Sequence, residues 1–95
     1  MFTPQARVDI EAAYNWYEAQ RPGMGEHFRH ELDRVWQLLE QFPALGPEIH
    51  RDVRRALVKH FPYAAYYRVV GNVIEVRACL DQRQDPREVR RRAET

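Results

Sequence analysis

The sequence predicts an α+β fold in which an N-terminal antiparallel helical hairpin packs on a small antiparallel β-sheet, followed by a short C-terminal helix. Two observations indicate this. Apolar residues recur at helical spacing through residues 4–42, and the pattern then changes to the alternation typical of strands. With 95 residues the chain is long enough for one modest core, so we expect residues 1–95 to form a single domain.

The first helix is predicted from Pro4 to Gln20. Thr3 is a suitable N-cap, and Pro4 suits the first helical position because its missing N–H would be unpaired there anyway. Pro22 and Gly23 end the helix, since proline cannot extend the hydrogen-bond ladder and glycine permits a reversal. The apolar stripe comprises Ala6, Ile10, Ala13, Tyr14 and Tyr17.

The second helix is predicted to begin near Gly25 and to end before Pro43 and Gly46. The link between the two helices is so short that they must form an antiparallel hairpin with both stripes facing one core. The second stripe comprises Phe28, Leu32, Val35, Trp36, Leu39 and Phe42.

Three strands are predicted in the second half, over Val53–Lys59, Tyr63–Val70 and Val73–Asp81. Gly71-Asn72 between the last two is a two-residue hairpin turn, the strongest local signal in the chain. Either face of the first strand can be buried, because apolar and basic residues occupy both of its alternations. Asp85 and Pro86 then predict the start of a short charged helix, as N-cap and first helical residue.

Strand alternation predicts which side chains face the helices. In the second strand these are Tyr63, Ala65, Tyr67 and Val69, so Tyr66 points the other way and is expected to be the exposed ring. In the third strand they are Ile74, Val76, Ala78 and Leu80, with Val73, Glu75, Arg77 and Cys79 on the opposite side.

Charge divides the chain unevenly. Residues 1–50 carry four Lys/Arg against eight Asp/Glu, hence −4, whereas residues 51–95 carry eleven against six, hence +5. A basic second half suits a nucleic acid or an acidic protein segment as partner, and a solvated arginine-rich tail is the alternative. The longest apolar run has five residues, far below a membrane span. Met1 is not followed by a basic and then apolar stretch, so we expect no secretory signal.

Several kinds of site are unsupported. One cysteine, Cys79, excludes an internal disulfide and a cysteine zinc site, and favours a reducing cytoplasm. On a central strand it is expected to pack rather than react. The chain has no serine and no glycine-rich phosphate loop. His27 and His30 lie three apart but off the apolar stripe, so we expect a solvated face, and no metal or cofactor.

Arginines are the remaining candidates for residues that bind a ligand or partner. Adjacent strands are expected to bring Arg54 or Arg55 near Arg68 and Arg77, and a loop after the last strand can display Arg83. A guanidinium cluster binds phosphates or carboxylates, but catalysis would also need a proton carrier.

The sequence resembles the ParE/RelE superfamily of bacterial type II toxin–antitoxin toxins, on the ParE side. The resemblance covers nearly the whole chain. It rests on Ala12–Gly23, Phe42–Pro47, Val53–Leu57, Phe61–Val69 and Arg83–Pro86.

The resemblance implies a toxin held inactive by a cognate antitoxin. ParE toxins poison DNA gyrase, whereas RelE toxins cut messenger RNA on the ribosome with basic side chains and often a C-terminal tyrosine. Here Arg83 occupies the family's arginine position, but the tyrosine position falls at Val89 and a mid-strand basic position at Ala64. Arg55 and Lys59 can serve as basic residues on the preceding strand.

We therefore expect a gyrase inhibitor that acts by binding through Arg54, Arg55, Lys59, Arg83 and Arg87. The alternatives are a ribosome-dependent endoribonuclease, with His60 or Tyr66 as substitute proton carrier, and a degenerate domain that only binds its antitoxin. The third rests on a departure from the family, whose fold begins with a strand: Met1–Thr3 leaves room only for a stub. A cytoplasmic location is expected.

Overall fold

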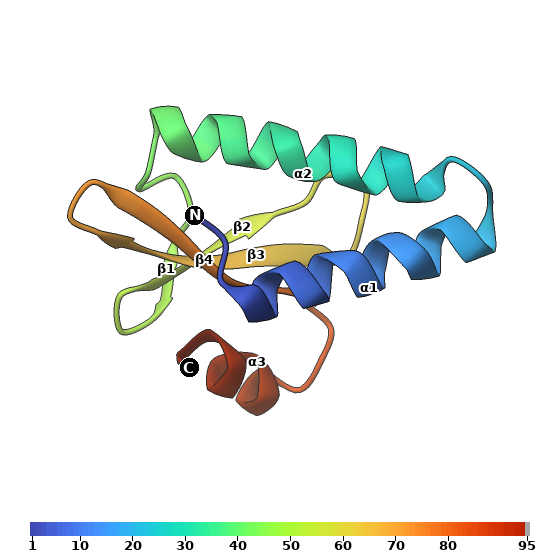
Figure 1. Cartoon of the computed structure of the whole chain (residues 1–95). Helices are drawn as coiled ribbons and strands as arrows, with labels where there is room; N and C mark the ends of the chain where they lie inside the picture. The colour runs from blue at the N-terminus through green and yellow to red at the C-terminus, as the bar shows by residue number, and fades with distance from the viewer. Residues whose placement is uncertain (95) are drawn as a thin grey trace.

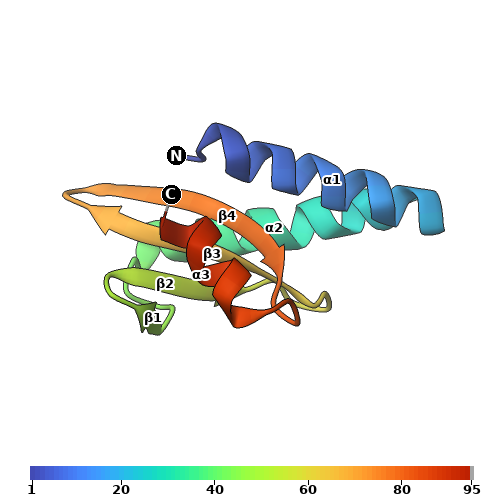
Figure 2. The same cartoon turned by 90° about the horizontal axis from the view of Figure 1, so that it is seen from below.

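The computed structural model of the chain describes residues 1–94, so Thr95 lies outside the described residues. A four-stranded antiparallel sheet of order β1-β2-β3-β4 has helices on both faces. α1 and α2 run side by side on one face, and α3 lies on the other (Figures 1 and 2). This is the predicted fold class with one more strand. The elements are α1 Pro4–Gln20, α2 Met24–Gln41, β1 Glu48–His50, β2 Val53–Leu57, β3 Tyr63–Val70, β4 Val73–Asp81 and α3 Pro86–Glu94.

Local chemistry sets the helix boundaries as predicted. The Thr3 hydroxyl accepts a hydrogen bond from the Ala6 amide at 3.2 Å and caps α1. The carboxylate of Asp85 accepts from the Arg87 amide at 2.9 Å and does the same for α3. Gly71 takes a φ of 61° in the two-residue turn that joins β3 to β4, a conformation that favours glycine.

The helical hairpin packs on β2, β3 and β4 through one continuous core. Ala6 and Ala13 of α1 and most of the predicted α2 stripe are buried in it. Tyr17 joins its aromatic part, with the ring stacked on Phe28 at 5.6 Å and edge-on to Phe61 at 4.8 Å between centroids. Phe42, at the far end of the predicted stripe, is exposed because α2 has already ended at Gln41.

A bulge in β4 corrects the predicted alternation. Tyr66 pairs with Ala78 and Tyr67 with Val76, so Arg77 is an extra residue in β4. The extra residue reverses the pattern beyond it. Ile74 and Val76 face the helical hairpin as predicted, but Cys79 faces it in place of Ala78 and Leu80, which face α3.

Tyr66 is not the exposed ring that alternation predicted. It does point away from the hairpin, but it is 2% exposed because Val89 and Ala93 of α3 cover it. This second, smaller core also contains Val53, Ala64, Ala78 and Leu80. The sheet is therefore buried on both faces at its centre.

The strand at β1 was not predicted. It has three residues, pairs with the start of β2, and the Arg55 amide donates to the Pro47 carbonyl at 3.1 Å. β2 ends at Leu57, two residues before the predicted boundary. Val69 pairs with Ile74 on the helix-facing side of the sheet, as predicted, but its side chain is exposed because it lies close to the β3–β4 turn.

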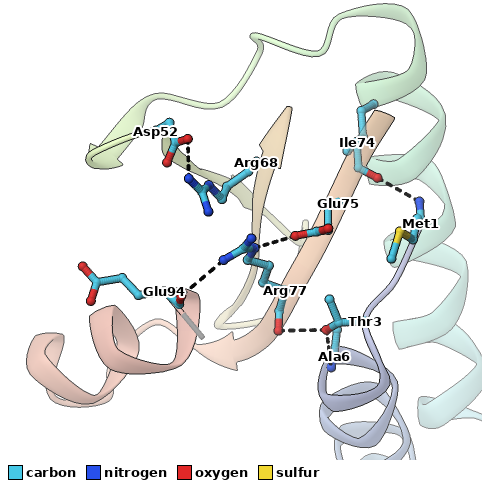
Figure 3. A network of polar contacts seen from close by, with 9 residues as sticks. All are labelled: Met1, Thr3, Ala6, Asp52, Arg68, Ile74, Glu75, Arg77 and Glu94. Carbon is cyan, nitrogen blue, oxygen red and sulfur yellow. Dashed lines mark hydrogen bonds and ion pairs between the residues drawn. The ribbon is translucent and has the colours of Figure 1, made fainter. Parts of the chain in front are cut away.

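The N-terminal stub is built into the sheet. Phe2 forms a parallel bridge with Val76, and the Met1 ammonium donates to the Ile74 carbonyl at 2.8 Å. The Thr3 hydroxyl donates to the Arg77 carbonyl at 3.3 Å (Figure 3). Three residues thus cover part of the outer edge of β4, and the Phe2 ring packs against Trp36.

α3 is held to the rest of the chain by polar contacts as well as by apolar packing. The Arg77 guanidinium lies between the Glu75 carboxylate, at 2.6 Å, and the Glu94 carbonyl, at 3.3 Å (Figure 3). Arg92 pairs with Asp9 of α1 at 2.8 Å, and the Glu94 carboxylate contacts His50.

None of the helices in residues 1–94 is long and apolar enough to cross a bilayer.

The buried hydroxyl of Tyr67 joins the α2–β1 loop to the sheet. It donates to the Pro43 carbonyl at 2.7 Å and accepts from the Gly46 amide at 3.1 Å. Gly46 has to be glycine, because a Cβ there would lie 2.3 Å from the Arg55 carbonyl oxygen.

We expect Tyr67→Phe to lower the free energy of unfolding by about 1–3 kcal/mol, because two backbone groups lose their partner inside the protein. Urea unfolding at neutral pH measures the change. Tyr63→Phe is the matched control, since the structure gives that hydroxyl no hydrogen bond within residues 1–94, and it should stay within about 0.5 kcal/mol of the parent. Equal effects for both variants would contradict this role for Tyr67.

Candidate functional site

The five predicted site residues lie on two faces of the molecule. Arg54 and Arg55 are adjacent in β2 and therefore point to opposite sides of the sheet. Lys59 lies in the β2–β3 loop, Arg83 in the loop after β4, and Arg87 in the first turn of α3. The structure places Arg55 beside the start of α3 and separates it from Arg54.

Arg54 is engaged in holding a loop. Its guanidinium donates to the Gly46 carbonyl at 2.7 Å and to the Ala44 carbonyl at 3.4 Å. These carbonyls belong to the connection between α2 and β1. The side chain thus supports the same loop as Tyr67, from the same face of the sheet.

Arg83 and Arg87 each form a local ion pair with the aspartate two residues earlier. Arg83 contacts Asp81 through two nitrogens, at 3.0 and 2.7 Å, and Arg87 contacts Asp85 through two, at 3.4 and 3.1 Å. The guanidinium hydrogen bond lowers the pKa of Asp81, and the same effect lowers the pKa of Asp85. Both arginines are exposed, but much of their charge is neutralised locally.

The predicted cluster of Arg68 and Arg77 with the β2 arginines does not form a free cationic site. Arg68 pairs with Asp52 at 2.6 Å, and Arg77 pairs with Glu75 at 2.6 Å (Figure 3). The hydrogen bond from Arg68 lowers the pKa of Asp52. The carboxylate partner of Arg68 lies in the β1–β2 turn, and that of Arg77 lies on the same strand, β4.

Arg55 lines a pocket of about 200 Å³ between the β1–β2 hairpin and the start of α3. It is half-buried, whereas Arg90 on the opposite wall is an exposed residue of α3. Arg90 was absent from the predicted site. The spacing of Pro86, Val89 and Arg90, at i, i+3 and i+4 on one helix face, is the signal that could have found it. The full lining is Ile49, His50, Arg55, Gln82, Gln84, Pro86, Val89 and Arg90.

Lys59 borders a separate, more apolar groove of about 580 Å³ between α2 and the β2–β3 loop. Leu38 and Leu57, both about half exposed, contribute to its lining together with Phe61 and His60. A lysine beside exposed leucines can bind a partner segment that carries both apolar and acidic residues.

The two substitute proton carriers considered for an RNase lie in different surroundings. His60 is exposed in the β2–β3 loop and lines the groove beside Lys59. Tyr66, one of the two substitutes considered for an RNase, is covered by α3, and burial raises its pKa. Tyr17 and Tyr63, near Arg83, have their pKa raised by burial as well. Val89, at the position where the resemblance places a tyrosine, is itself buried against the second core.

Cys79 is packed inside the protein as predicted. It is 1% exposed, its amide donates to Asp9 at 3.1 Å, and burial raises the pKa of its thiol from 9.0 to about 12. A thiol in this state is a poor nucleophile at neutral pH. His27 and His30 are both exposed, and residues 1–94 contain no group of three residues suited to hold a metal ion.

Comparison with solved structures supports this architecture. A chain of the structure described as the chromosomal ParDE toxin–antitoxin system of P. aeruginosa superimposes with a TM-score of 0.72 at 23% identity, covering 82% of this chain and 88% of that chain. The two chains therefore share one fold.

The family is assigned from the sequence. The family model described as the ParE toxin of type II toxin–antitoxin system, parDE, matches residues 1–86. The chain belongs to the ParE toxin family, and the family implies an antitoxin partner. No curated protein matches the chain significantly.

Burial of Cys79 gives a pH dependence of stability. The unfolded thiol ionises near pH 9, whereas the folded thiol stays protonated up to about pH 12. Stability from this group is therefore complete below pH 9 and is lost as the pH rises towards 12, by about 1.4 kcal/mol per pH unit.

Between pH 8 and pH 10 the parent should lose about 1.4 kcal/mol more unfolding free energy than Cys79→Ala, which has no thiol to ionise. Urea unfolding at the two pH values measures this difference between the proteins. Parallel losses in the two proteins would show that the thiol ionises equally in both states.

Proposed function

We propose that this ParE-family protein is a bacterial toxin that inhibits DNA gyrase by binding it, acts in the cytoplasm, and is neutralised by a cognate antitoxin. Family membership supports a toxin with an antitoxin partner. The observation that carries the binding mode is the burial of Tyr66 and Val89 between α3 and the sheet, on the face that also carries Arg55. The proposed target-binding residues are Arg54, Arg55, Lys59, Arg83 and Arg87.

Binding fits this surface better than cleavage does. General acid–base cleavage of RNA needs groups that titrate near neutrality and reach the scissile bond. Burial raises the pKa of Tyr17, Tyr63 and Tyr66, which moves all three further from neutrality. His60 is exposed, but it lines the groove beside Lys59 rather than the pocket that contains Arg55. Arginines with carboxylate partners can position a protein target without transferring a proton.

The proposed antitoxin contact uses the basic half of the chain and its exposed apolar residues. A partner segment with leucine-like and acidic side chains would cover Leu38 and Leu57 while meeting Lys59. Electrostatic attraction to residues 51–95, which carry a net charge of +5, would speed the encounter.

Pulse-labelling after induction in bacteria tests the target. We expect thymidine incorporation to fall before methionine incorporation, and the purified protein to inhibit supercoiling of a relaxed plasmid by gyrase. An earlier fall in methionine incorporation, with transcripts cut at defined codons, would replace gyrase with the ribosome. Folded protein that inhibits neither process would indicate an antitoxin-binding domain without toxicity.

Arg83→Ala should weaken gyrase inhibition about tenfold or more while the fold survives, because one charged contact is removed from an exposed loop. The concentration that halves supercoiling activity measures the effect, and circular dichroism checks folding. Arg21→Ala is the control, since it removes the same charge from the α1–α2 turn. Undiminished inhibition by folded Arg83→Ala would remove Arg83 from the binding surface.

A further inference from the structure

The pocket between the β1–β2 hairpin and α3 contains two guanidinium groups that lack a carboxylate partner. Within residues 1–94 the structure gives the side chains of Arg55 and Arg90 no hydrogen bond and no ion pair. The amides of Gln82 and Gln84 share the pocket with them, and Ile49 and Val89 add apolar wall. These groups make a small concave site with two positive charges and several hydrogen-bond donors.

Five other arginines near this side of the molecule have carboxylate partners, whereas Arg51, exposed in the β1–β2 turn, has none within residues 1–94. The pairs are Arg68–Asp52, Arg77–Glu75, Arg83–Asp81, Arg87–Asp85 and Arg91–Glu88. His50 also lines the pocket, and its ring contacts the Glu94 carboxylate. The unneutralised arginine charge inside the pocket is therefore that of Arg55 and Arg90, and Arg51 in the adjacent turn adds a further positive charge outside it.

Arg55 has no carboxylate partner within residues 1–94. It is half-buried in the pocket, where water reaches it less freely than it reaches Arg87 on the open surface. A charged group that is partly removed from water gains more from a charge-assisted hydrogen bond than a fully solvated one does. A bound anion would provide one, and Arg90 on the opposite wall would complete its coordination.

We propose that this pocket binds the carboxylate of one aspartate or glutamate side chain from an acidic peptide segment of a protein partner. The proposal rests on the proposed function in one respect, that the basic face meets a protein. The planar guanidinium groups of Arg55 and Arg90 would each hold the carboxylate through paired N–H donors. Ile49, Pro86 and Val89 would contact the methylene groups beside it.

The same features disfavour a nucleic-acid backbone as ligand. Nucleic-acid binding draws its affinity from a series of free cations that follow successive phosphates and release counterions. Here Arg83, Arg87 and Arg91, which extend along the loop and α3, are already paired with carboxylates. A volume of about 200 Å³ also admits a side chain rather than a strand.

Side-chain NMR of the ¹⁵N-arginine-labelled protein can test the site with hexaglutamate as probe at 150 mM salt. We expect the Nε–H signals of Arg55 and Arg90 to shift on titration, and those of Arg83 and Arg87 to shift much less. Arg90→Gln should weaken hexaglutamate binding about tenfold. Arg90 has no partner within residues 1–94 to lose, so this variant should keep its fold.

Two controls make the result specific. Arg21→Gln removes the same charge in the α1–α2 turn and should bind hexaglutamate like the parent. A single-stranded oligonucleotide and inorganic phosphate, at equal charge concentration, should shift Arg55 and Arg90 less than hexaglutamate does. Three results would each overturn the proposal. The first is an equal loss of hexaglutamate affinity in Arg90→Gln and Arg21→Gln. The others are signal shifts centred on Arg83 and Arg87, and stronger binding of the oligonucleotide than of hexaglutamate.

This test is independent of the gyrase assay. If hexaglutamate binds at Arg55 and Arg90 but the protein does not inhibit supercoiling, the carboxylate-binding pocket stands and gyrase is rejected as the target. If the protein inhibits supercoiling but does not bind hexaglutamate, gyrase stands as the target and the carboxylate-binding pocket is rejected.

Discussion

The structure depends on burying the middle of β3 on both faces. Ala64, Ala65, Tyr66 and Tyr67 are consecutive and all buried, and consecutive strand residues point to opposite sides of a sheet. Packing against only one face of the sheet would therefore leave two of these four side chains exposed. The helical hairpin covers Ala65 and Tyr67, and α3 covers Ala64 and Tyr66. This requirement explains why an arginine-rich C-terminal helix of low hydrophobicity is nevertheless packed against the sheet.

The bulge at Arg77 adapts β4 to the same requirement. It lets Ile74 and Val76 join the hairpin core while Ala78 and Leu80, further along the strand, join the core beneath α3. The bulge also places Arg77 where it contacts both Glu75 and the end of α3. The bulge at Arg77 thus determines both the apolar packing of β4 and the polar contacts that hold α3.

The fastening of α3 has a consequence for function. Much of the basic charge in the second half of the chain is used inside the protein. Arg54 binds loop carbonyls, Arg77 binds the carboxylate of Glu75 on its own strand, and Arg92 binds that of Asp9 on α1. The net charge of residues 51–95 consequently overstates the charge that a partner meets. A target-binding surface built on the remaining groups is compact, which suits a protein partner better than an extended polyanion.

Short-range chemistry in the sequence determined the helices, the hairpin turn and the family. Thr3 and Asp85 cap helices, Pro22 and Gly23 end one, and Gly71-Asn72 turns a hairpin, because each effect acts within a few residues. The resemblance to ParE toxins followed from motifs in the same order as these elements. Arg55, Arg83 and Arg87 could be proposed because their residue type and strand or loop position are local properties.

Only the tertiary structure decided the pairing partners. The bulge at Arg77 depends on the register between β3 and β4, the burial of Tyr66 depends on α3, and β1 exists because β2 lies beside it. Which arginines are neutralised and which remain free depends on carboxylates and carbonyls that become neighbours on folding. Arg55 and Arg90 illustrate this, because residues 35 apart in the sequence line one pocket once α3 packs beside β2. Such long-range juxtapositions leave no periodic trace in the sequence, and so residue spacing alone could not predict them.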